Sequence, residues 1–308
     1  MAVDTPTGTE KPPARESAGL LDPKFMSKLE RLSIMAKRVK LGTTRGERKS
    51  KRKGSSVDFA DYRDYVQGDD LRHVDWNIYG RLESLYIKLF EEREDLTLHL
   101  LIDASRSMAF GTPHKLTFAK QLAAALGYIA LAGHERVSIE AFSGNSVQRI
   151  TPCRGKGSTQ KLFSFIESIE SDGGTNLEDS CHAYLARNRT KGVAVIISDF
   201  FDEKGFEGPI RRLNQAGSDL YAIQVLAPEE IEPQLTGDLK LIDSETQAYA
   251  EISVSRALLK RYKKNRDGFL DSIRQYCTAR GVGHVVASSD TSIEELTLDL
   301  LRKGGMVR

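Results

Sequence analysis

The chain has 308 residues, 40% hydrophobic and 29% charged, which is ordinary for a globular protein of one large or two small domains. Its net charge of +2 indicates no class of partner, and no run of about 18 apolar residues predicts a transmembrane segment. Cys153, Cys181 and Cys277 form no CxxC pair, which argues against disulfides and zinc and for a reducing compartment. The N-terminus lacks the apolar core of a signal peptide, so we expect a cytoplasmic protein.

The first part of the chain predicts a tail followed by a helix. Residues 1–20 are polar and rich in Pro, Thr and Glu, so we expect them to be disordered. Asp22 and Pro23 form a helix start, with an N-cap followed by proline at the first helical position. Apolar residues then recur at helical spacing until Gly42. This pattern predicts a helix over 22–41 whose single apolar stripe must dock on another element.

A strongly basic segment overlaps the end of this helix. Residues 37–53 contain nine Lys or Arg residues and a single acid, Glu47. Such a run can bind phosphates or anionic lipid. It contains no aromatic residue, so stacking on single-stranded nucleic acid is not indicated. The alternative is a solvated loop that binds nothing.

Residues 57–90 mix acids with aromatic side chains. Five acids lie within thirteen residues and close to Arg63 and Arg72; they are Asp58, Asp61, Asp64, Asp69 and Asp70. An acidic catalytic cluster is one interpretation. We favour an ion-paired network with aromatic packing that fixes an irregular subdomain, because no spacing here matches an acid–base pair. Residues 84–90 alternate apolar and polar side chains and predict a strand.

From Leu96 onward, strand and helix patterns alternate, which predicts an α/β fold with a mostly parallel sheet and helices on both faces. The expected strands are 96–103, 136–142, 146–150, 193–198, 219–226 and 284–287, and the expected helices are 115–132, 158–169, 176–188, 208–215, 255–280 and 291–301. Residues 229–253 break this rhythm. Two alternating stretches, 238–243 and 247–253, predict a β-hairpin inserted into the α/β domain.

Oxygen-bearing side chains follow two of the apolar strands and fill one glycine-rich loop. Asp103, Ser105 and Ser107 follow strand 96–103, Asp199 follows strand 193–198, and Thr175 lies in the loop 172–176. Ligands bind at the carboxyl ends of the strands in open α/β sheets. Carboxylates and hydroxyls suit Mg²⁺, Mn²⁺ or Ca²⁺ rather than zinc. The alternative, that these residues only form turns and cap helices, must hold for three loops independently.

These residues carry a resemblance. Asp103-x-Ser105-x-Ser107, with Thr175 and Asp199, resembles the metal-ion-dependent adhesion site of von Willebrand factor A domains. The acidic-aromatic stretch 58–70, with Asp75-Trp76 and residues 86–91, is similar to the signature of the bacterial family called domain of unknown function 58. Together the resemblance covers about residues 25–305. It implies a von Willebrand A-like, Rossmann-type domain over 93–308, with residues 21–92 as an extension packed on it.

The resemblance also implies roles for the site. Ser105, Ser107 and Thr175 would ligate the metal through hydroxyls, and Asp103 and Asp199 would hold it mostly through water. The remaining position would accept an acidic side chain of a partner protein. Such sites bind and do not turn over a small-molecule substrate. Family members are often encoded with MoxR-type AAA+ ATPases, which implies an adaptor for such an ATPase and its client in complex assembly or maturation.

Two other functions compete with this one. The first is a metal-dependent phosphohydrolase using Asp103 and Asp199. Against it, the position two residues after Asp103 is Ser105 rather than a second acid, and no Lys or His stands at a spacing typical of a general acid. The second is binding of nucleic acid or anionic lipid through residues 37–53, which would weaken steeply with salt. We expect no catalytic residues.

Overall fold

The computed structural model describes residues 20–34, 57–92, 96–144, 146–188, 190–235, 237–242, 249–300 and 306. The expected tail, apart from residue 20, and the basic segment 37–53 lie outside these ranges, so both expectations stay predictions.

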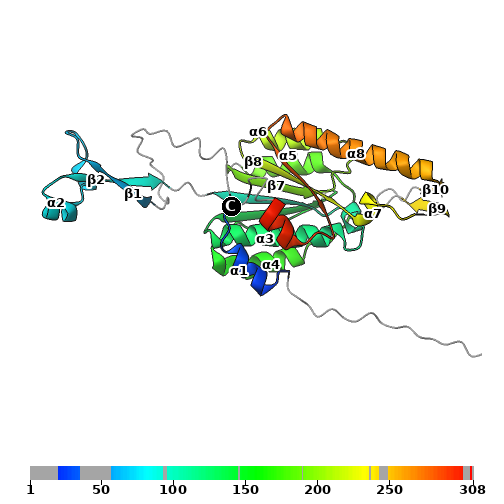
Figure 1. The fold of residues 1–308 in the computed structure, drawn as a ribbon, viewed down its shortest axis with the longest axis horizontal. Coiled ribbons are helices and arrows are strands. Elements are labelled where there is room, and N and C mark those ends of the chain that lie inside the picture. Colours follow the sequence, from blue (N-terminus) through cyan, green and yellow to red (C-terminus); the bar gives the residue numbers. More distant parts are fainter. Residues whose placement is uncertain are drawn as a thin grey trace, which may run out of the picture.

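A central sheet organises the main domain (Figure 1), and its strands follow the order β11-β8-β7-β3-β4-β5, with β6 also paired to β4. The strands are β3 (Thr97–Asp103), β4 (Arg136–Ser143), β5 (Ser146–Arg149), β6 (Cys153–Arg154), β7 (Gly192–Ser198), β8 (Asp219–Leu226) and β11 (Gly283–Ser288). Only β5 and β6 run antiparallel to their neighbour β4. The predicted mostly parallel sheet is confirmed.

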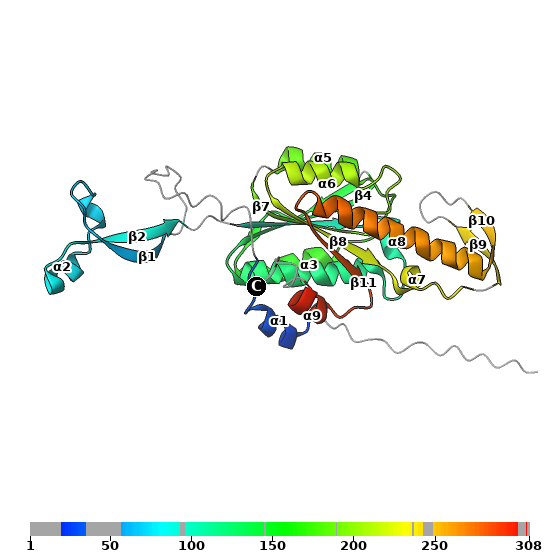
Figure 2. The same cartoon turned by 45° about the horizontal axis from the view of Figure 1, so that its top comes forward.

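Helices cover both faces of the sheet (Figures 1 and 2). On one side lie α1 (Pro23–Leu29), α3 (Lys115–Ala132), α4 (Thr159–Glu167) and α9 (Ile293–Glu295), and on the other α5 (Leu177–Arg187), α6 (Glu207–Gln215) and α8 (Arg256–Thr278). Side chains of β3 alternate between the two cores: Leu100 packs with α3, whereas Leu101 packs with α5 and α6. Burial on both faces explains why β3 and β7 read as continuous apolar runs.

A buried histidine on β3 makes stability depend on pH. The side chain of His99 is 1% exposed, its Nε2 lies 3.2 Å from Thr190 Oγ1, and its Nδ1 has no hydrogen-bond partner within the described ranges. Burial lowers the pKa of His99 to about 4. Between pH 6.5 and 4, His99 is therefore protonated in the unfolded chain but neutral in the folded protein. Protonation thus stabilises the unfolded state, and the free energy of unfolding falls as the pH falls. We expect His99 to account for a loss of about 2 kcal/mol between pH 8 and pH 5.

Urea denaturation at the two pH values measures this loss. The His99→Gln variant should lose about 2 kcal/mol less than the unsubstituted protein on going to pH 5. The matched control is His182→Gln, since His182 is exposed on α5. An identical pH dependence in His99→Gln would show that His99 does not contribute.

The N-terminal helix docks on the main domain but is shorter than predicted. Asp22 caps α1 through a bond from Lys24 N, as the sequence indicates. The helix ends at Leu29 rather than near residue 41, and residues 35–41 lie outside the described ranges. Phe25 and Leu29 are buried in the core that α3 lines. The single apolar stripe is thereby covered.

Residues 57–92 form a hairpin where we expected an irregular subdomain. β1 (Val57–Asp64) pairs antiparallel with β2 (Tyr86–Glu92), and a 3₁₀ turn (Leu71–His73) and α2 (Trp76–Leu82) lie between them. The expected ion pairs form between Arg63 and Asp69 and between Arg72 and Asp70. Figures 1 and 2 both draw this unit apart from the α/β domain. α1 contacts α3 of that domain, whereas the expected packing of residues 57–92 on it stays a prediction.

The inserted hairpin is confirmed. β9 (Gly237–Ile242) pairs antiparallel with β10 (Tyr249–Val254). A short helix that we did not predict, α7 (Pro228–Ile231), connects β8 to it. None of the helices in the described ranges combines the length and apolar character that a membrane crossing needs.

Candidate metal centre

The centre of the site lies where β3 and β7 end side by side. These strands pair in parallel with Ile102 opposite Ile197, so Asp103 and Ser198 become neighbours. Ser198 Oγ donates to Asp103 Oδ2 at 2.6 Å, and Ser105 N donates to Asp103 Oδ1 at 3.0 Å. Asp103 is 1% exposed and Ser198 is fully buried. Both oxygens of the Asp103 carboxylate are thus held by protein donors.

Asp199 is held by a lysine that the sequence did not single out. Phe201 N donates to Asp199 Oδ1 at 3.1 Å, and Lys115 Nζ lies 2.8 Å from Asp199 Oδ2. The same ammonium lies 2.7 Å from Glu230 Oε1 on α7. The side chains of Lys115 and Asp199 are 1% and 0% exposed. A buried cation therefore links three elements, because α3, the end of β7 and α7 each supply one of the charged groups.

The two serines fit a hard cation. Ser105 Oγ and Ser107 Oγ lie 3.1 Å apart and share a hydrogen bond. Adjacent ligands of an octahedral Mg²⁺ at about 2.1 Å lie about 3.0 Å apart, so these hydroxyls match one edge of that octahedron. Their oxygens are hard ligands, and the buried carboxylate of Asp103 lies beside them, where it accepts from Ser105 N. The donor set therefore suits Mg²⁺ or a related ion.

The glycine-rich loop lies against the same turn. Asp172 N donates to Ala104 O at 3.0 Å, and Arg106 N donates to Gly173 O at 3.1 Å. These bonds place the half-buried Thr175 in a loop that contacts the residues between Asp103 and Ser107. The structure thus brings together all three segments that carry the predicted ligands.

The charged groups perturb one another. Burial first, and then the negative charge of Asp199, raise the pKa of Asp103 well above its usual range. Burial alone would lower the pKa of Lys115, but Asp199 and Glu230 together raise it above its usual value. Burial also raises the pKa of Glu230, against the opposing effect of Lys115. Lys115 therefore stays charged at neutral pH and offsets part of the buried negative charge.

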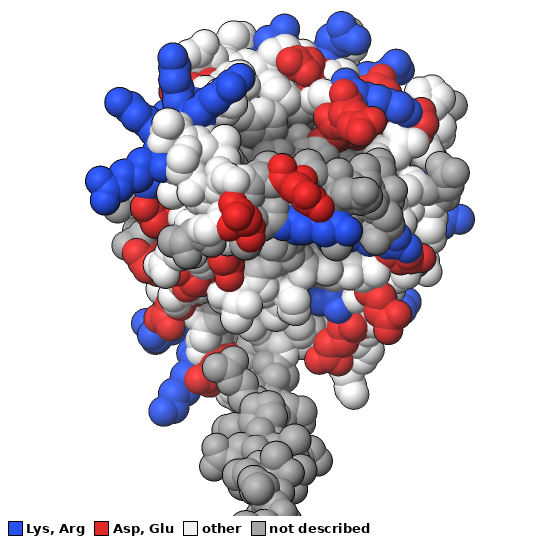
Figure 3. Space-filling model, turned by 90° about the vertical axis from the view of Figure 1, so that its right-hand side faces the viewer, with Lys and Arg blue, Asp and Glu red and all other residues white. Residues whose placement is uncertain are grey.

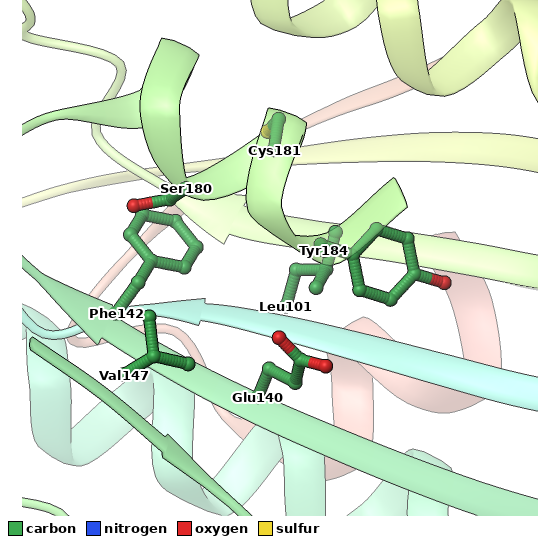
Figure 4. Close-up of a pocket in the computed structure, with 7 residues that line it drawn as sticks. All are labelled: Leu101, Glu140, Phe142, Val147, Ser180, Cys181 and Tyr184. Atoms are coloured by element: carbon green, nitrogen blue, oxygen red, sulfur yellow. The ribbon is translucent and has the colours of Figure 1, made fainter. Parts of the chain in front are cut away.

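A second concave region has few polar groups that could bind a ligand. Leu101, Glu140, Phe142, Val147, Ser180, Cys181 and Tyr184 line a small pocket between the sheet and α5 (Figure 4). Its single carboxylate, Glu140, already accepts from Arg187 and Asn188. Within the described ranges no group of three or more His, Cys, Asp or Glu residues could hold a metal ion. The hydroxyl-rich site at the sheet edge remains the candidate.

The surface does not reveal the charges of this site. Figure 3 shows the end of the molecule that carries α7 and the β9–β10 hairpin, with acidic and basic side chains interspersed over it. Asp103, Lys115 and Asp199 are buried, so their charges are not part of the molecular surface. Recognition at the site would therefore depend on local geometry rather than on a long-range field of one sign.

The amino-acid sequence matches a known protein family and several individual proteins. The family described as "Protein of unknown function DUF58" matches residues 61–268. An uncharacterized protein of Mycobacterium tuberculosis is 26% identical over 296 residues, which cover 94% of this chain and 92% of that protein. An uncharacterized protein of Mycobacterium avium is 34% identical over 89 residues, which cover 29% of this chain and 52% of that protein.

Solved structures with similar folds include von Willebrand A domains. A von Willebrand factor type A protein from Catenulispora acidiphila is 11% identical, with a TM-score of 0.39 over 70% of this chain and 43% of that chain. The SpRpn10 VWA domain is 13% identical, with a TM-score of 0.40; the match covers 68% of this chain and 95% of that domain. An aerotolerance-related membrane protein from Bacteroides fragilis is 17% identical, with a TM-score of 0.36; the match covers 55% of this chain and 87% of that chain.

Proposed function

Since this chain belongs to the DUF58 family, whose function is unknown, we propose from its site that it is a non-enzymatic, metal-dependent protein-binding module. Ser105, Ser107 and Thr175 would hold Mg²⁺, or Mn²⁺ or Ca²⁺, through their hydroxyls. Asp103 and Asp199 would act mostly through bridging water. When bound, the ion supplies an open coordination position that attracts a carboxylate.

The observation that carries this proposal is the spacing of the serine hydroxyls. At 3.1 Å, Ser105 Oγ and Ser107 Oγ lie close to the separation of two adjacent ligands of Mg²⁺. They are neutral, so the bound ion would keep a net attraction for an anion. An Asp or Glu side chain from another protein satisfies that attraction. The proposed partners are a MoxR-type AAA+ ATPase and its client protein.

Asp103 is better placed to orient the site than to act as a nucleophile. Ser198 Oγ and Ser105 N occupy its two oxygens. The carboxylate is also only 1% exposed, so a phosphoryl group has little access to its remaining lone pairs. This arrangement favours binding over phosphohydrolysis.

Removing the Asp103 charge should weaken metal binding. We expect Asp103→Asn to lower the affinity for Mg²⁺ by about 10–100-fold, the usual effect of losing a group that acts on the metal from the outer shell. Ser105→Ala and Ser107→Ala should have smaller effects, because each removes a neutral ligand. Calorimetric titration with Mg²⁺ measures these affinities. Asp172→Asn is the control, since that carboxylate is exposed in the neighbouring loop; unchanged affinity in Asp103→Asn would contradict the site.

The same variants test the partner. A pull-down with a MoxR-type ATPase, in Mg²⁺ and in EDTA, should capture the ATPase only in Mg²⁺ and not with Asp103→Asn. Capture that persists in EDTA, with the protein shown to be metal-free, would move the interface away from this site.

A further inference from the structure

The site described above already contains a cation. Lys115 Nζ lies 2.8 Å from Asp199 Oδ2 and 2.7 Å from Glu230 Oε1, and its side chain is 1% exposed. The other oxygen of Asp199 accepts from Phe201 N. The carboxylate that a metal ion would share is therefore paired with an ammonium from the first residue of α3.

Glu230 is fixed in place independently of Lys115. Its Oε2 accepts from Ala227 N at 2.8 Å, and its carbonyl oxygen accepts from Tyr262 OH on α8 at 2.8 Å. Glu230 can thus keep Lys115 paired when the ammonium leaves Asp199. Lysine carries its charge on a flexible four-carbon stem, which allows such a short shift.

We propose that Lys115 is a resident cation that competes with the divalent ion for Asp199, and that Glu230 holds the displaced ammonium. The inference rests on the proposed function, since it concerns regulation of the same site. A divalent ion and an ammonium that share one buried carboxylate repel each other strongly, because the surroundings screen charge weakly. Loading the ion therefore requires Lys115 to move toward Glu230. Without the ion, Lys115 neutralises Asp199 and keeps the site closed to weakly bound cations.

The competition predicts opposite effects for the two partners of the ion pair. Lys115→Met should tighten Mn²⁺ binding by about tenfold or more, because no ammonium has to be displaced. Glu230→Gln should weaken it by a similar factor, because the displaced ammonium loses its second carboxylate. Two control variants distinguish the loss of the Lys115 ion pair from the general effect of removing a nearby charge. Lys204→Met removes an exposed lysine near the Thr175 loop, and Glu229→Gln removes an acid of α7 that bonds Thr112 N instead of Lys115.

Mn²⁺ binding is measured by the loss of the free-ion signal in electron paramagnetic resonance, on variants shown to be folded by circular dichroism. Tighter binding in Lys115→Met and weaker binding in Glu230→Gln, with both controls within about twofold, supports the inference. Equal affinity of wild type and a folded Lys115→Met overturns the inference and leaves the proposed function standing. If Lys115→Met does not fold, Glu230→Gln decides alone: affinity equal to that of Glu229→Gln overturns the inference.

If the wild-type protein binds no Mn²⁺, two outcomes for Lys115→Met remain to be distinguished. Binding by Lys115→Met only would support Lys115 as the excluding cation and contradict the metal dependence of the wild-type function. No binding by either folded protein would overturn both the inference and the metal site.

Discussion

Replacing Lys115 with methionine is expected to lower the free energy of unfolding in metal-free buffer by about 3–5 kcal/mol. The substitution leaves the carboxylates of Asp199 and Glu230 without their cation, and Asp199 is fully buried. Breaking a buried ion pair on one side costs far more than the pair itself contributes, because the remaining charge stays away from water. Urea denaturation with EDTA present measures the change.

Two further variants test the cause of this loss. Lys28→Met removes an exposed partner of Glu294 and should cost less than about 1 kcal/mol. Combining Lys115→Met with Asp199→Asn and Glu230→Gln removes all three charges and should recover most of the stability. A loss in the triple variant as large as in Lys115→Met alone would assign the effect to packing instead of charge.

Replacing Gly192 with alanine is expected to cost about 3 kcal/mol or more. Gly192 begins β7 and pairs with Thr97 of β3. A Cβ atom at this position would lie 2.0 Å from the carbonyl oxygen of Thr97 and 2.9 Å from its carbonyl carbon. Both strands lie inside the sheet with neighbours on each side, so neither backbone can shift freely. Thermal and urea denaturation should both report the loss.

The chain offers a glycine with the opposite surroundings. Gly268 lies within α8, and a Cβ atom there would meet no atom within 4 Å. Gly268→Ala should therefore leave stability unchanged or raise it by up to about 1 kcal/mol, because alanine favours the helix. A similar loss in both variants would contradict the close approach of β3 and β7.

Much of the α/β domain could be predicted from periodicity. The helix over 115–132 and the strand over 219–226 have the predicted bounds, because long uniform patterns define them. β2 confirms the strand expected over residues 84–90, but its partner β1, and with it the hairpin, was missed for a physical reason. A β-bulge shifts the register between Phe59 and Asp61, so apolar and polar residues do not alternate strictly. α7 was missed because its four residues are too few to show a helical period.

The site could be predicted only in part. Asp103, Ser105, Ser107 and Asp199 stand at strand ends, which a sequence marks clearly. The pairing of Lys115 with Asp199 joins positions 84 residues apart, and that with Glu230 joins positions 115 residues apart. One signal was present: Lys115 lies four residues before Ala119, in phase with the buried face of α3. A lysine on an apolar face requires a partner, but the sequence does not say which.

The contact between α1 and α9 has a consequence for how the protein is made. Both helices pack on α3, and Lys28 pairs with Glu294, 266 positions later in the chain. At about 5–20 residues per second, a ribosome needs about 10–50 s to synthesise the chain between them. α1 can dock on α3 early, but its partner on α9 is made only after all the strands of the central sheet. The helical layer on this side of the sheet is therefore completed after the sheet itself has been synthesised.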